Sequence, residues 1–120
     1  MMLERIGWLV LALGIHLPPF VAFFMPSLIT KLYSIAPDDP NFALFHHRAA
    51  LFGVVMIICL CAAFDPNVRK AAFAVTALSM ISFLAIYFGY GQPQSLRTIA
   101  LVDGLGLPFL AYVGWKAFMA

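Results

Sequence analysis

Charged and polar side chains that interrupt long apolar runs are the residues of this chain that could do chemistry. In an apolar environment such groups cost free energy, and those that are kept usually face a polar interior. Histidine exchanges protons near neutral pH, whereas a guanidinium and a carboxylate can pair with each other or with a ligand. The pattern predicts a polar ligand-binding site, with no catalytic role assigned, made of His16, His46, His47, Arg48, Ser82 and Asp103.

The composition indicates which elements must hold these side chains. Of the 120 residues, 64% are hydrophobic and 10% are charged, and the mean hydropathy is +0.99. A bilayer core needs about 20 consecutive apolar residues per helix, and four such stretches use nearly the whole chain. No length is left for a water-soluble catalytic domain. We therefore predict an all-α integral membrane four-helix bundle, a single domain of residues 1–120 with helices at about 6–25, 42–64, 71–90 and 99–118.

Two of the predicted helices are preceded by the same tripeptide. The sequence Asp-Pro-Asn occurs at 39–41 and again at 65–67. Aspartate can accept hydrogen bonds from the free amides of a first helical turn, and proline suits the first helical position. We therefore expect helices to begin near Pro40 and Pro66.

The candidate residues fall at one predicted depth, in the half of the bundle away from the termini. At about 1.5 Å of rise per residue, Arg48 lies roughly 12 Å from Pro40, and Asp103 lies roughly 10 Å from Leu96. Either charge alone would be costly at this depth. We therefore expect Arg48 to contact Asp103 directly or through water, with His16 lining the same cavity. A purely structural ion pair that joins the second and fourth helices is the alternative.

The two adjacent histidines cannot play the same role. Neighbours on a helix point about 100° apart, so we expect His47 rather than His46 to face inward. Haem or metal ligation by His16 with one of these two histidines is an alternative, although we predict no metal site. The sequence identifies no cofactor.

The basic residues predict how the helices cross the membrane. With four spans both termini lie on one side, and the opposite side carries only Lys31 and Arg97 outside the spans. Cytoplasmic loops are enriched in Lys and Arg, so we expect cytoplasmic termini. Trp8 and Trp115 are expected to anchor the helices at that interface. The basic residues on the side of the termini are Arg5, Arg69, Lys70 and Lys116.

Several short motifs resemble those of DoxX-like proteins, which are small bacterial membrane proteins with four helices. The motifs are His16-Leu17-Pro18, Lys31-Leu32-Tyr33, Asp39-Pro40-Asn41, His47-Arg48-Ala49 and Asp103 in the last helix. The resemblance implies a helical bundle in a bacterial inner membrane and does not imply a reaction.

Three classes of function are compatible with these features. The first is a binding protein that takes a small ligand, lipid or quinone, or an accessory subunit of a larger membrane complex. The second is a membrane enzyme or redox component that uses histidine with Asp103 and Arg48. The third is a proton-coupled small exporter, although the first helix has no glutamate at membrane depth. The lipid bilayer is the expected partner, with a homo-oligomer possible, and the net charge of +2 without a basic patch excludes nucleic acid.

Overall fold

The computed structural model describes residues 2–119, and most of them are helical. Four helical segments are long and apolar enough to cross a membrane by length and composition. The predicted all-α fold with four long apolar helices is therefore confirmed, and the predicted bounds lie within a few residues of the observed ones. The four spans are Met2–Phe24, Phe42–Phe64, Pro66–Gly89 and Arg97–Met119.

The first and third spans are composite. The first is built from α1 (Met2–Leu9), the π-helical segment η1 (Val10–His16) and α2 (Leu17–Phe24). The third begins with the 3-10 turn η2 (Pro66–Val68) and continues as α5 (Arg69–Gly89). The second span is α4 (Phe42–Phe64), and the fourth is α6 (Arg97–Met119), which follows the 3-10 turn η3 (Gln94–Leu96). The short helix α3 (Ser27–Tyr33) was not predicted.

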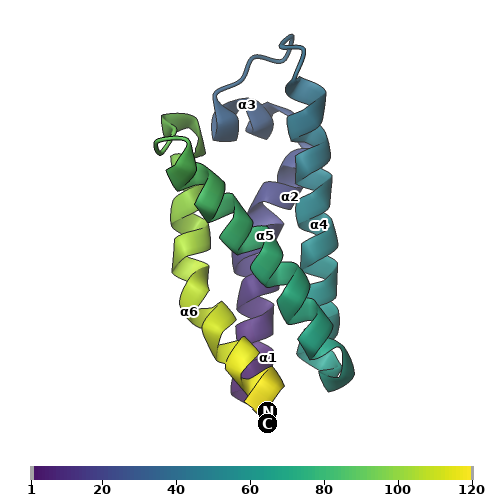
Figure 1. Cartoon of the computed structure of the whole chain (residues 1–120). Coiled ribbons are helices and arrows are strands. Elements are labelled where there is room, and N and C mark those ends of the chain that lie inside the picture. The colour runs from purple at the N-terminus through teal and green to yellow at the C-terminus, as the bar shows by residue number, and fades with distance from the viewer. Residues whose placement is uncertain (1, 120) are drawn as a thin grey trace.

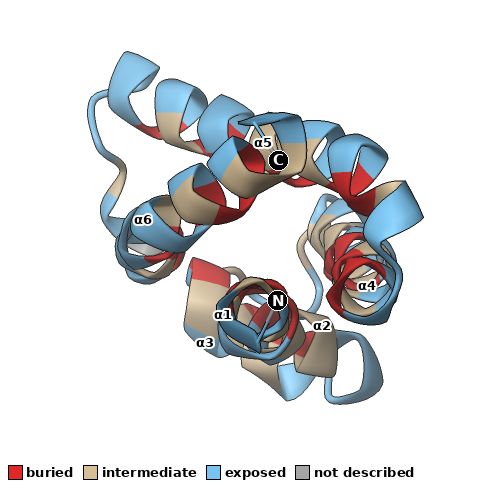
Figure 2. Ribbon diagram, turned by 90° about the horizontal axis from the view of Figure 1, so that it is seen from below, coloured by how far each residue is buried: buried red, intermediate tan, exposed pale blue. Residues whose placement is uncertain are grey.

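The helices form an elongated bundle with extents of 48 × 29 × 18 Å. Both termini lie at the lower end in Figure 1, and α3 lies at the upper end. Helix α5 crosses the bundle obliquely: it is next to α4 at the lower turn and next to α6 at the upper one (Figure 1). In Figure 2 buried residues line the faces that the helices turn toward one another, and the outward faces are exposed. Many of these exposed side chains are large and apolar, which suits a lipid environment.

The buried apolar residues form two clusters, one above the other. The lower cluster consists of Trp8, Leu11, Ala12, Ile15, Val55, Cys59, Ala62, Ala63, Ala72, Met80, Leu110 and Val113. The upper cluster consists of Ala22, Ile29, Tyr33, Ala49, Phe52, Phe83, Tyr87, Ile99 and Ala100. On the first span His16 falls between Ile15 of the lower cluster and Ala22 of the upper one. On α6 Asp103 falls between Ala100 of the upper cluster and Leu110 of the lower one. Both polar residues therefore lie at the boundary between the two clusters.

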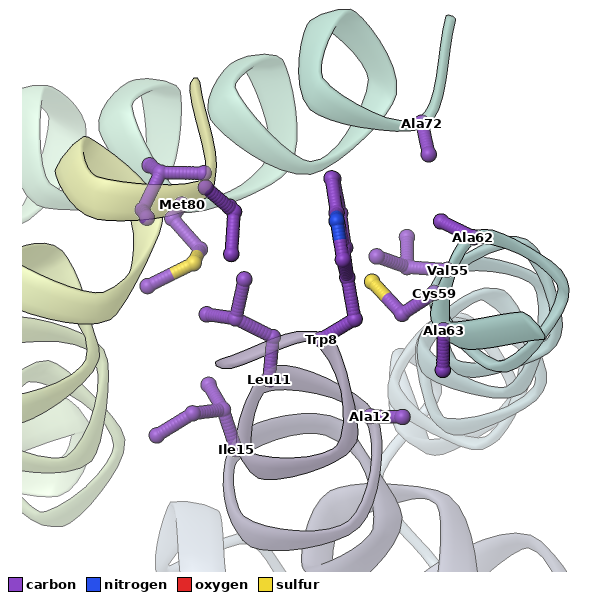
Figure 3. Close-up of a cluster of buried hydrophobic side chains, with 12 residues drawn as sticks. Trp8, Leu11, Ala12, Ile15, Val55, Cys59, Ala62, Ala63, Ala72 and Met80 are labelled. Atoms are coloured by element: carbon purple, nitrogen blue, oxygen red, sulfur yellow. The ribbon is translucent and has the colours of Figure 1, made fainter. Parts of the chain in front are cut away.

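Trp8 is not an interfacial anchor, which corrects the expectation from the sequence. Its side chain is fully buried at the centre of the lower cluster (Figure 3). Trp8 is spaced from Leu11, Ala12 and Ile15 by three, four and seven residues, which places all four on one helical face. Because that face points into the bundle, the indole does too. Trp115 is exposed near the lower end, as an anchor would be.

The close approach of α6 to its neighbours depends on Gly106. A Cβ atom at this position would lie 2.8 Å from Met80 Cε of α5 and 3.0 Å from Ile15 of η1. Small residues allow such contacts between membrane helices. Asp103, one turn earlier on α6, is therefore carried into the interior rather than to the lipid face.

Both Asp-Pro-Asn motifs form the same local turn. The backbone amide of Asn41 donates to Asp39 Oδ1 at 2.8 Å, and that of Asn67 donates to Asp65 Oδ1 at 2.9 Å. Each motif therefore forms the turn that precedes a helix, as the sequence predicted near Pro40 and Pro66. The regular α-helices begin slightly later, with α4 at Phe42 and α5 after the 3-10 turn.

The side chain of Arg69 connects three spans at the lower end of the bundle. Arg69 Nη1 lies 3.0 Å from Glu4 Oε2, which joins α5 to α1. Arg69 also donates to two carbonyls at the end of α4, from Nε to Ala62 at 2.7 Å and from Nη2 to Ala63 at 3.3 Å. These carbonyls have no partner within their own helix because the helix ends there. Arg69 is therefore a buried structural residue rather than a free loop charge.

Candidate functional site

His16 lies at the end of the π-helical segment, and its ring is 0% exposed. The following prolines, Pro18 and Pro19, have no amide hydrogen and cannot complete the regular hydrogen-bond ladder of the preceding turn. Nδ1 of His16 lies 2.8 Å from the carbonyl oxygen of Leu11 and donates to it. Nε2 is buried and has no hydrogen-bond partner among the described residues. The ring centroid lies 6.0 Å from that of Phe52 on α4.

Arg48 is held in the upper cluster by a hydroxyl and three aromatic rings. Its Nε donates to the Tyr33 hydroxyl at 3.2 Å. The guanidinium carbon lies 4.7 Å from the ring centroid of Phe83, 5.1 Å from that of Phe52 and 6.0 Å from that of Tyr33. Because Phe52 is one turn deeper on α4 and Phe83 belongs to α5, the side chain reaches into the bundle instead of extending to the upper surface.

The side chain of Asp103 is almost fully buried, with 2% of the residue exposed. It forms no hydrogen bond or ion pair within residues 2–119. The expected direct ion pair with Arg48 is therefore not formed among these residues: the guanidinium packs on the rings of Phe52 and Phe83, and its Nε donates to Tyr33.

Tyr33 lies outside the four spans, and both Arg48 and Asp103 affect the pKa of its hydroxyl. Burial raises the pKa of Tyr33 above its ordinary value of 10.0. The nearby Arg48 guanidinium opposes this shift, and the Asp103 carboxylate adds to it. Tyr33 therefore contacts Arg48 directly, whereas Asp103 affects it only electrostatically.

The two adjacent histidines lie on different sides of α4, as their spacing predicts. The ring of His46 packs on Phe23, with 5.2 Å between centroids, and its Nε2 lies 2.9 Å from the Phe23 carbonyl oxygen. His47 is exposed and lines a shallow hollow beside Arg48 and Asn41. The expectation that His47 faces inward is wrong, because the hydrogen bond to α2 turns His46 toward the bundle.

A cleft of about 420 Å³ lies between α4 and α5 and includes Arg48 in its lining. The two helices separate toward the upper end, where α5 turns away to meet α6 (Figure 1). Ser79 and Ser82 of α5 are the other polar residues of the lining, and the Ser82 hydroxyl donates to the Ser79 carbonyl at 3.4 Å. The rest of the lining is apolar: Phe45, Leu51, Phe52, Val54, Val55, Val75, Leu78, Phe83, Ile86 and Leu96.

The structure brings together only part of the predicted set of site residues. Arg48 and Ser82 share the cleft, and His47 lies in the neighbouring hollow with Arg48. The ring of Phe52 lies in the cleft lining and also near His16, whereas His46 contacts α2. Asp103 lines neither of these cavities.

Three aromatic residues of the site were missed by the sequence analysis, namely Tyr33, Phe52 and Phe83. Phe52 follows Arg48 by four residues, so the pair lies on one helical face, and this spacing could have indicated the contact. No sequence signal distinguishes Phe83 from the other phenylalanines of the chain.

The three residues around Arg48 come from α3, α4 and α5, and the arrangement can bind a polar group next to an apolar surface. No metal-binding group of three or more His, Cys, Asp or Glu side chains occurs in the described part of the chain. Comparison of the chain with known protein families, with curated proteins and with solved structures finds no match.

Proposed function

We propose that this chain is a multi-pass protein of a bacterial inner membrane that binds a small amphiphilic molecule in the cleft between α4 and α5. The observation that carries the proposal is Arg48, the one charged side chain among the described residues that line a mostly apolar cleft. Small-molecule sites are typically apolar cavities of about 300 to 1,000 Å³ with a few well-placed polar groups. The cleft has this size and this composition.

The position of the cleft favours uptake of the ligand from the bilayer. Its rim includes Leu51, Val54 and Leu78, which are exposed on the outward faces of α4 and α5. In a membrane these side chains would contact lipid. An amphiphile would therefore enter from the side, with its polar head at Arg48 and its apolar tail along the valines of the lining.

Filling the cleft tests this proposal. Leu78 on the rim is 71% exposed, and Leu105 on α6, which lines no cavity described above, is 73% exposed. The Leu78→Trp variant should lose bound ligand, and the matched Leu105→Trp variant should keep it. Native mass spectrometry of protein purified with its lipids would detect the ligand as an added mass. Equal retention of ligand by both variants would count against this cleft, and a wild-type protein with no added mass would count against the function.

We also propose that both termini face the cytoplasm, in a chain related to DoxX-like proteins. The orientation is supported by four basic residues at the lower end against two at the upper end. Pairing of Arg69 with Glu4 does not weaken the argument, because acidic residues contribute little to this rule. A reporter that is active only in the periplasm, fused after residue 120, should stay inactive. Activity of the fusion would reverse the orientation.

A further inference from the structure

No side chain of the described residues 2–119 forms an ion pair with Arg48. The chain has five acidic residues. Four of them, Glu4, Asp38, Asp39 and Asp65, lie in loops or at the lower end of α1. The fifth, Asp103, forms no ion pair with Arg48 within residues 2–119. A guanidinium in an apolar setting is costly unless an anion neutralises it.

The contacts of Arg48 fix its orientation and leave donors free. Only Nε forms a hydrogen bond, to the Tyr33 hydroxyl, and the Nη atoms form none within the described residues. The faces of Phe52 and Phe83 attract the cation and restrict its motion. Ring faces do not neutralise the charge, so the N–H groups on Nη remain available to an acceptor.

The geometry of a guanidinium selects among amphiphilic ligands. Its parallel N–H groups match the two oxygens of a carboxylate, and such paired bonds are among the strongest in proteins. A neutral quinone would leave the charge uncompensated. A zwitterionic lipid would bring an ammonium group close to Arg48.

The depth of Arg48 disfavours a two-chain phospholipid. Arg48 lies about 9 Å along α4 from its first residue, Phe42, at about 1.5 Å per residue. A glycerophosphate group belongs at the membrane surface and would have to be drawn inward with both of its chains. A fatty acid has a small head and one tail. From Arg48 to Val55 the cleft offers roughly 10 Å for the part of that tail next to the head, by the same rise per residue.

We infer that the ligand of the cleft is a single-chain amphiphile with one carboxylate head, such as an ionised long-chain fatty acid, bound through Arg48. This inference rests on the proposed function and specifies the ligand. The carboxylate would accept hydrogen bonds from the Nη atoms of Arg48, beside the hydroxyl groups of Ser79 and Ser82. The tail would lie against Val54, Val55 and Val75.

Thermal unfolding of the delipidated full-length protein in neutral detergent tests the inference with four probes of matched chain length. The probes are palmitate, 1-hexadecanol, methyl palmitate and hexadecyl phosphate, all at pH 8. Palmitate at saturating concentration should raise Tm by about 5 °C. The alcohol and the ester should give less than about a third of that shift, because they lack the charge.

Two arginine variants assign the effect to the site. Arg48→Gln should weaken palmitate binding more than about tenfold and remove the preference for palmitate over hexadecanol. The matched control Arg97→Gln removes the same charge from an exposed position at the upper end and should leave both unchanged. If Arg48→Gln does not fold, Arg48→Lys decides: it keeps the charge but loses the paired N–H geometry, and its preference for palmitate should shrink.

The possible results separate the inference from the proposed function. Equal stabilisation by palmitate and hexadecanol would overturn the carboxylate and leave the cleft as a binding site. Stronger binding of hexadecyl phosphate would assign a phosphate head instead. If no probe shifts Tm and Leu78→Trp changes nothing, both the inference and the proposed function fail. A dimer that persists with and without palmitate and is lost in Leu78→Trp would assign the cleft to a second copy of the chain.

Discussion

Arg48 and Tyr33 are joined by a hydrogen bond of 3.2 Å from Nε to the hydroxyl oxygen, although fifteen residues separate them in the sequence. Tyr33 is the last residue of α3, and Arg48 lies on the second turn of α4. The bond holds the connection between the first two spans against the upper end of the bundle. Arg48 therefore bonds to α3 and not to Asp103, the partner that was predicted from its depth.

Replacement of Tyr33 by Phe should destabilise the protein by about 1 to 3 kcal/mol, because a hydrogen bond to a charged group is lost while the ring remains. The matched control is Tyr90→Phe, since the Tyr90 hydroxyl lies on an exposed side chain. That change should cost less than about 0.5 kcal/mol. Denaturant unfolding in detergent measures both values, and equal effects would show that the Tyr33 hydroxyl contributes nothing.

Stability should fall in alkaline solution partly because of Tyr33. Burial raises the pKa of this hydroxyl above 10.0 in the folded chain, so the unfolded chain loses the proton first as the pH rises. Stability is therefore constant below pH 10.0 with respect to this group and decreases from there up to the folded pKa. The slope is about 1.4 kcal/mol per pH unit at most. The free energies of unfolding of the wild type and the less stable Tyr33→Phe should therefore approach each other between about pH 9 and pH 11, and a constant difference would contradict the assignment.

Arg69 should matter far more than its exposed neighbour Lys70. Arg69→Met removes an ion pair and two hydrogen bonds to the last carbonyls of α4, and a loss of about 3 to 5 kcal/mol is expected. Glu4→Gln leaves both carbonyl contacts in place and should cost less. Lys70→Met is the control, with an expected change below about 0.5 kcal/mol. Unfolding in detergent would contradict the structure if Arg69→Met and Lys70→Met were equally mild.

The buried side chain of His16 should contribute little to the stability of the protein. Replacement by Leu loses the bond from Nδ1 to the Leu11 carbonyl but also removes the unpartnered Nε2 from the interior. These effects oppose each other, so the net change should be within about 1 kcal/mol. Leu11→Ala is a reference for the same region and should cost about 2 to 5 kcal/mol, because it opens a cavity in the lower cluster. A large loss for His16→Leu would mean that a bound water or ligand satisfies Nε2.

The fold could be predicted because long apolar segments leave a chain few structures in a membrane. The turns at Asp39 and Asp65 could also be predicted, since a side chain that bonds to its own backbone needs no tertiary contact. The helix α3 carries a weaker signal. Seven residues between two spans do not meet the length criterion for a span, and their helical state depends on packing of Ile29 and Tyr33 into the upper cluster.

The candidate site was predicted only in part because the position of a residue along a helix does not determine the direction in which its side chain points. Arg48 and Asp103 are at similar predicted depths, but depth does not show which side chain each one meets. The oblique path of α5 places Phe83 against Arg48, and no local sequence pattern indicates that crossing. The same limit explains Trp8, whose chemistry suits a membrane interface and whose helical face is buried.

Arg48 and Asp103 should show weak coupling in a double-mutant cycle, since they form no hydrogen bond or ion pair with each other within residues 2–119. Asp103→Asn removes a carboxylate that forms no hydrogen bond within residues 2–119, and the change should cost less than about 1 kcal/mol. Arg48→Met should cost more, because it also leaves the Tyr33 hydroxyl without its donor.

The coupling energy of this cycle, measured by unfolding in detergent, should stay below about 1.5 kcal/mol, against about 3 to 5 kcal/mol for the loss of one partner of a buried contact pair. Palmitate provides an independent readout on the same variants. Asp103→Asn removes a competing negative charge near Arg48 and should bind palmitate as tightly as the wild type or more tightly. Coupling of 3 kcal/mol or more, together with loss of palmitate binding in Asp103→Asn, would show that the two side chains form a direct pair in the membrane and act on the ligand as one unit.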